Sequence, residues 1–197
     1  WGLVDAVHPR SKFDEAVAER ATALTGDSDR PAAGPGIELG PLALTRTADR
    51  LEYSTVAVTI ERAKRTAELT VRAPDGPEPD TIEEIVVAGD QYWPLRAFRE
   101  LDASLLHMRL NEPEIGVIVL KTVGDADAVL AVDRTLAAHQ DHWLVREILH
   151  FMKRTLKRLD LTARSLIALI EPGSCFAGSL LELALAADQS FMLDDPE

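Results

Sequence analysis

The stretch Ser165–Asp188 reads SLIALIEPGSCFAGSLLELALAAD and decides the fold of this chain. Its first six residues are nearly all apolar, which is typical of a strand inside a sheet. A loop with two glycines follows at 171–179, and the apolar spacing over 180–187 predicts a helix. A strand that passes through such a loop into a helix leaves unpaired backbone N–H groups, which face an anion or a polarised carbonyl.

The flanking segments alternate between strand and helix patterns. They predict a β-hairpin at 56–60 and 67–71, a helix at about 94–109, an apolar strand at 115–120, a helix at 141–159, and a last strand at 190–193. The runs 115–120 and 165–170 are nearly continuous in apolar residues, so we expect strands covered on both faces. Hairpin, helix, strand, helix, strand, helix and strand in this order indicate the α/β class.

The first 50 residues are organised differently. Apolar positions at helical spacing predict a short amphipathic helix over 12–25, and Gly26 ends it. The segment 31–36 is rich in Pro and Gly, so a domain boundary falls within 26–50. The chain opens at Trp1 and closes shortly after an apolar run, so we expect it to be cut at both ends.

Composition limits the class of partner. The formal net charge of -12 argues against a nucleic-acid partner, because phosphate binding needs a basic surface. No apolar run approaches the roughly 20 residues needed to span a bilayer, and no leader pattern opens the chain. The single cysteine, Cys175, excludes an internal disulfide and fits a reducing compartment. We therefore expect a cytoplasmic protein that binds neither nucleic acid nor membrane.

The 171–179 loop and the helix after it hold the candidate site. The unpaired backbone N–H groups of this loop, which ends with Gly178 and Ser179, suit the oxygen of a thioester enolate, because preset donors stabilise developing charge. Glu182 lies in the first turn of the helix, where a carboxyl can act as acid or base. A purely structural role for this loop and for Glu182 stays open, because such loops are common and the helix dipole alone favours Glu in a first turn.

Three further groups of residues could in principle act as a nucleophile, a metal site or a phosphate-binding surface. Cys175 precedes a helix N-terminus, but no His or Asp pairs with it in the sequence, and we interpret it as inert. His139 and His142 form a pair without further ligands, so we expect no metal site. A locally basic segment can attract phosphates or simply be solvated. Its members are Arg146, Lys153, Arg154, Lys157, Arg158 and Arg164.

The whole stretch 165–188 resembles the signature of the crotonase superfamily, a strand and glycine-rich loop followed by Glu-Leu-Ala-Leu-Ala and Asp. The hairpin at 55–73 and the run 98–122 are similar to the opening of such a unit, and GLVDAV at 2–7 is similar to the end of one. The resemblance implies a crotonase-like spiral of ββα units, incomplete in this chain. It also implies the tail of a first unit at 1–30, a linker at 31–50, and the front half of a second unit at 51–197.

The segments 142–147 and 170–178 resemble a ring-cleaving branch of the superfamily more than ordinary enoyl-CoA hydratases. This resemblance implies a lyase that opens the ring of 2,3-epoxybenzoyl-CoA with water, giving an open-chain semialdehyde thioester and formate, in aerobic degradation of aromatic acids. It implies that no separate cofactor is needed, since coenzyme A is part of the substrate. It also implies that the protein forms a homo-oligomer. A simple enoyl-CoA hydratase or isomerase and a non-catalytic packing module remain as alternatives.

Two positions depart from the superfamily pattern. By position Ser179 matches a glycine that donates to the thioester oxygen, and Glu182 matches a glutamate that is catalytic in many hydratases. A thioester can approach the backbone less closely at Ser179 and Leu180 than at glycines, because both residues carry a side chain. The second donor loop is expected at 123–129, where its usual pattern is not visible. We therefore expect the working site in the first unit and a structural role for the second.

Overall fold

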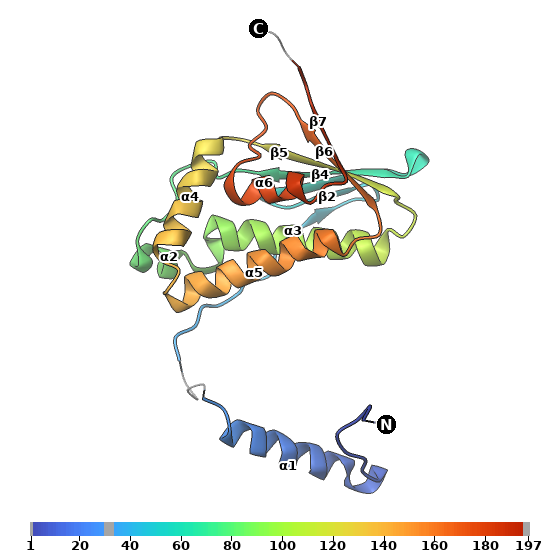
Figure 1. Ribbon diagram of the computed structural model, residues 1–197, viewed down its shortest axis with the longest axis vertical. Coiled ribbons are helices and arrows are strands. Elements are labelled where there is room, and N and C mark those ends of the chain that lie inside the picture. Colours follow the sequence, from blue (N-terminus) through green and yellow to red (C-terminus); the bar gives the residue numbers. More distant parts are fainter. Residues whose placement is uncertain (1, 30–33, 195–197) are drawn as a thin grey trace. The chain divides into compact units, whose positions relative to one another are not determined.

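The computed structural model describes residues 2–29 and 34–194 (Figure 1). The chain divides into two units, 1–36 and 37–197, which are described separately below. Parts of three predictions fall outside the described residues. These are the opening Trp1, the Pro31–Ala33 part of the linker, and the last residues 195–197.

The first unit consists of a 3-10 turn, η1 (Arg10–Lys12), and the helix α1 (Phe13–Gly26). This confirms the helix predicted at 12–25, including its end at Gly26. No described residue of α1 is buried, and Phe13, Val17 and Leu24 are about half exposed. Their spacing makes one apolar stripe, which the described residues of this unit leave about half exposed.

The second unit is built on a sheet whose strands lie side by side in chain order. The strands are β1 (Thr45–Arg46), β2 (Arg50–Glu52), β3 (Val56–Glu61), β4 (Thr66–Arg72), β5 (Val117–Val123), β6 (Ser165–Ile170) and β7 (Gln189–Met192). Pairing is antiparallel from β1 to β4 and parallel from β4 to β7. The α/β class predicted from the sequence is therefore confirmed.

Helices connect the parallel strands. They are α2 (Ile82–Ala88), α3 (Trp93–Asn111), α4 (Ala126–Ala138), α5 (Trp143–Asp160) and α6 (Gly178–Leu185), with short 3-10 turns η2 (Arg62–Lys64) and η3 (Gly89–Gln91). Figure 1 shows α3, α5 and α6 on the same side of the sheet, with α3 and α5 packed together. No helix in the described part of the chain is both long and apolar enough to cross a bilayer.

The core lies between the sheet and these helices. Side chains alternate along each strand, so Ile118, Leu120 and Leu166 point to the helices and are buried. Val117, Val119 and Ile167 point to the other face and are half-buried. Within the described residues, the expectation that 115–120 and 165–170 are covered on both faces therefore holds only in part, because the side chains on the second face are half-buried.

The sequence patterns did not predict four elements: β1, β2, α2 and α4. The two strands are only two and three residues long, too short to show alternation. Helix α2 does carry a start signal, since the Thr81 hydroxyl accepts the N–H of Glu84 and the Glu84 carboxylate accepts that of Asp80. Asp125 likewise caps α4 by accepting the N–H of Asp127.

The ion pair of Arg62 and Glu112 makes the stability of this unit depend on pH. Arg62 Nη1 lies 2.6 Å from Glu112 Oε2, and the Glu112 carboxyl is nearly buried. The hydrogen bond from Arg62 outweighs burial and holds the pKa of Glu112 below its ordinary value of about 4.5. A carboxyl with a lowered pKa stabilises the fold above that value, and the contribution is lost as the pH falls through the folded-state pKa.

We therefore expect Glu112→Gln to be less stable than the wild type at pH 7, and the difference to shrink as the pH falls below about 4.5. Urea midpoints of the full-length protein measured between pH 7 and 3 check this. The exposed neighbour Glu114, replaced by Gln, is the control and should show no such convergence. A Glu112→Gln penalty that stays constant across the range would contradict the assignment.

Candidate functional site

The loop 171–179 is held in place by its own polar groups and by the end of β5. The Ser174 hydroxyl accepts the N–H of Glu171, and Gly173 takes a left-handed conformation with φ of 83°. The N–H of Cys175 donates to Thr122 Oγ1 over 2.9 Å, and both residues are buried. The loop therefore delivers the chain to the start of α6 in a defined geometry.

The first predicted oxyanion donor is already bonded. The N–H of Ser179 donates to Asp133 Oδ2 over 2.5 Å, and Asp133 belongs to α4. A carboxylate at a helix N-terminus is favoured both by the free N–H groups and by the helix dipole. Asp133 therefore occupies the Ser179 N–H that the sequence analysis assigned to a thioester oxygen.

Gly178 is shaped to admit this carboxylate. Its φ is 48°, in the left-handed region that favours glycine, and an added Cβ would overlap the carboxylate of Asp133 and come within 3.3 Å of Leu130 Cδ2. The glycine therefore makes room for a side chain of α4. Sequence reasoning assigned Gly178 to substrate binding, and the structure places it against Asp133.

The second predicted donor segment, 123–129, closes onto the same loop. The N–H of Gly124 donates to the carbonyl of Gly173 over 3.0 Å, and its φ is 130°. A Cβ at Gly124 would lie 2.6 Å from Ala73 Cβ, so the two chain segments touch there. The N–H of Asp127 is taken by Asp125, as described above. This segment therefore caps α4 and braces the 171–179 loop.

Glu182 and Ser179 line one cavity of about 520 Å³ between α5 and α6. The structure therefore brings these two predicted residues together. Glu182 is exposed, and its side chain takes part in no hydrogen bond or ion pair with the residues described (2–29 and 34–194). The Ser179 hydroxyl is buried and has no partner within the same residues. Lys153 and Lys157 stand on the other wall of this cavity.

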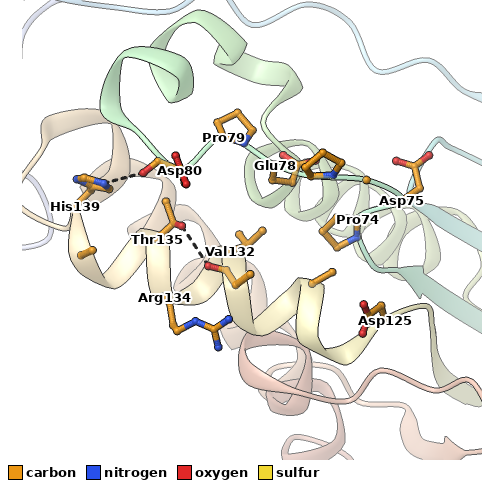
Figure 2. Close-up of a pocket in the computed structure, with 15 residues that line it drawn as sticks. Pro74, Asp75, Glu78, Pro79, Asp80, Asp125, Val132, Arg134, Thr135 and His139 are labelled. Carbon is orange, nitrogen blue, oxygen red and sulfur yellow. Dashed lines mark hydrogen bonds between the residues drawn. The ribbon is translucent and has the colours of Figure 1, made fainter.

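A larger cavity, of about 790 Å³, lies between the segment 74–80 and α4 (Figure 2). Four carboxylates line it: Asp75, Glu78, Asp80 and Asp125. Its one arginine, Arg134, is directed away from the segment 74–80 in Figure 2, and His139 Nε2 lies 3.0 Å from the Asp80 carbonyl oxygen. Burial raises the pKa of Glu78, whose carboxylate accepts the N–H of Trp93. Such a wall repels the phosphates of coenzyme A.

The remaining candidate residues are buried or take part in contacts that hold the fold together. Cys175 is fully buried and burial raises the pKa of its thiol, which agrees with the interpretation that it is inert. Within the described residues no three potential metal ligands gather, at His139 and His142 or elsewhere. Arg158 pairs with Asp102, and Arg164 donates to the carbonyls of Met108, Glu112 and Ile115. These two members of the basic segment therefore join helices and strands.

Sequence reasoning missed Asp133, whose carboxylate decides what the start of α6 can bind. No local pattern marks it, because it lies in a helix that was not predicted and its contact with Ser179 spans 46 residues. Thr122, near the end of β5, was missed because its partner Cys175 lies 53 residues away, in the loop that follows β6. Only the approach of α4 and β5 to the loop brings these partners together.

Comparison with known proteins gives one strong relationship. All 197 residues align at 48% identity with benzoyl-CoA-dihydrodiol lyase from Aromatoleum evansii, and the chain spans 36% of the length of that relative. This confirms that the resemblance noted for segments 142–147 and 170–178 is to this lyase. No family model matches the chain.

Two solved structures also match. An enoyl-CoA hydratase from Geobacillus kaustophilus HTA426 is 20% identical, with a TM-score of 0.47, over 74% of this chain and 48% of that one. A probable enoyl-CoA hydratase from Mycobacterium thermoresistibile is 16% identical, with a TM-score of 0.38, over 70% of this chain and 49% of that one.

Proposed function

We propose, from the homology of this chain over its whole length to a section of benzoyl-CoA-dihydrodiol lyase, that the whole protein is a carbon–carbon lyase of the crotonase superfamily that acts on a coenzyme A thioester. The observation that carries this proposal is the 48% identity across all 197 residues. The signature-like stretch 165–188 supports it, and so does its place as strand, loop and helix in a parallel sheet.

The proposed substrate is 2,3-epoxybenzoyl-CoA. Ring opening with water would give an open-chain semialdehyde thioester and formate, with coenzyme A present as part of the substrate. The resemblance of segments 142–147 and 170–178 to the ring-cleaving branch supports this choice over a simple enoyl-CoA hydratase. The cytoplasmic location and the homo-oligomer stay predictions.

We place the reaction centre outside the loop 171–179. An oxyanion hole needs free donors aimed at the position of the developing charge. Here the N–H of Ser179 is occupied by Asp133, and that of Gly124 by the carbonyl of Gly173. The acidic lining of the larger cavity also argues against coenzyme A phosphates there. These contacts favour a structural role for this section within the lyase.

Formate release from 2,3-epoxybenzoyl-CoA by the full-length protein tests the lyase proposal, with hydration of crotonyl-CoA measured in parallel. We expect formate and little hydration. Hydration of crotonyl-CoA without formate would replace the proposal with an ordinary hydratase.

Glu182→Ala in the full-length protein tests where the reaction centre lies. We expect kcat/KM to change by less than about twofold, because no transition-state contact is removed. Glu147→Ala, another exposed glutamate, is the matched control. A loss of about a hundredfold or more, in the range expected for an acid–base group, would place the reaction at Glu182 after all.

A further inference from the structure

A cavity of about 570 Å³ lies where α3 and α5 end and the chain turns toward β5 and β6. Arg109, near the end of α3, lines it together with Thr162 and Arg164, which lie between α5 and β6. We call it the arginine cavity. Among the described residues that line it there is no carboxylate. It therefore contrasts with the acidic cavity between the segment 74–80 and α4.

The two guanidinium groups are fixed by backbone carbonyls. Arg164 donates from Nε and Nη2 to the three carbonyls named above, each over 2.7 Å. Arg109 Nη2 donates to the carbonyl of Arg158 over 3.1 Å, where the ends of α3 and α5 lie side by side (Figure 1). The last carbonyls of a helix lack partners within it, so cations are favourable there. Capping of helix ends therefore accounts for these donors.

Capping leaves the other donors of the cavity unused. A guanidinium group carries five N–H groups. Within residues 2–29 and 34–194, Nη1 of Arg164 and both Nε and Nη1 of Arg109 have no hydrogen-bond partner, and neither arginine forms an ion pair. The Thr162 hydroxyl has no partner there either. The cavity therefore offers a ligand fixed donors that the fold does not need.

The charges in the cavity favour an anion. Burial lowers the pKa of Arg164 from its ordinary value, and the positive charge of Arg109 lowers it further. The Glu112 carboxylate acts in the opposite sense, but it is paired with Arg62. Two positive charges therefore stand near each other without a carboxylate of their own, and a bound anion would relieve their repulsion.

The arrangement suits a phosphate group better than a carboxylate. A carboxylate has two oxygens in one plane and matches the fork of a single arginine. A phosphate group presents oxygens in several directions, so it can accept from both guanidinium groups and from the Thr162 hydroxyl at once. Its charge of about -1.5 to -2 at pH 7 also matches two arginines.

We propose that the arginine cavity binds a phosphate group, either free phosphate or the phosphate of a small ester. Gly116 and Arg164 line it and directly precede the parallel strands β5 and β6. The cavity therefore lies at the amino ends of these strands, whereas the loop 171–179 follows the carboxyl end of β6. The site is separate from that loop and does not depend on the proposed reaction.

Calorimetric titration of the full-length protein with inorganic phosphate tests the proposal. We expect binding, and we expect Arg109→Gln to raise Kd by about tenfold or more, because charge-assisted hydrogen bonds are lost. Arg134→Gln is the matched control. It removes the same charge from the larger cavity and should change Kd by less than about twofold. Absence of phosphate binding, or an equal effect of the two substitutions, would overturn the proposal.

Thr162→Val gives a second variant that keeps both arginines and their contacts with the helix ends. It removes one neutral donor, so Kd should rise by about threefold or more. Wild-type affinity in this variant would place the phosphate elsewhere and count against the site.

Amide hydrogen exchange locates the ligand and distinguishes its sources. Saturating phosphate should slow exchange at 161–165 by about threefold or more, and acetate at the same ionic strength should not. Equal protection by acetate would refute the choice of a phosphate group. Tighter binding of glycerol 3-phosphate than of phosphate would identify an ester as the ligand, and weaker binding would identify free phosphate.

Discussion

Glu100→Gln is expected to destabilise the fold by about 3 kcal/mol, because hydrogen bonds to a buried charged group are among the costliest to lose. Glu100 lies on α3 and is 2% exposed. Its carboxylate accepts five hydrogen bonds from the turn before β3. The donors are the N–H and hydroxyl of Ser54, the N–H and hydroxyl of Thr55, and the N–H of Val56. A glutamine of the same size would turn one acceptor into a donor that faces other donors.

Urea unfolding of the full-length protein measures this effect. Local hydrogen exchange at 54–56 shows whether the turn itself opens. Glu147→Gln on α5 is the matched control, because Glu147 is exposed and makes no hydrogen bond or ion pair within the described residues. If both variants lose the same stability, the five contacts of Glu100 do not hold α3 against the sheet.

Gly178→Ala is expected to destabilise α6 by about 2–3 kcal/mol. Placing a Cβ in a left-handed conformation costs about 1–2 kcal/mol, and loss of a helix cap about 1 kcal/mol. At Gly178 both penalties apply, because the Cβ would displace the carboxylate of Asp133 from the N–H of Ser179. Gly116→Ala is the control, since a Cβ there meets nothing within 4 Å.

A double-mutant cycle separates the two causes. Asp133→Ala alone should lose the cap, and adding Gly178→Ala to it should cost less than Gly178→Ala does in the wild type, because the overlap has gone. Hydrogen exchange of α6 in the full-length protein provides the free energies. Strictly additive effects would mean that Gly178 and Asp133 do not act on each other.

The sequence by itself determined the elements that carry a regular pattern. Period-two and period-3.6 spacing of apolar residues placed β3, β4, α3, α5 and α6 to within a few residues, because the repeat of side chains along a strand or helix is a local property. Nearly continuous apolar runs placed β5 and β6 in the same way. It also carried the signature stretch 165–188 and the phrases at 142–147 and 170–178, whose relationship to the lyase the 48% identity confirms. It placed Glu182 and Ser179 near one another, in adjacent turns of α6.

Only the tertiary structure decided what these elements face. Val117 and Ile118 are equally apolar in the sequence, yet helices on one side of the sheet bury Ile118 and leave Val117 half-buried. The N–H of Ser179 is free in any local description of a strand, loop and helix. It is bonded here because α4 brings Asp133 to within 2.5 Å across 46 residues of chain. Contacts of that kind depend on how distant segments pack, and no local pattern encodes them.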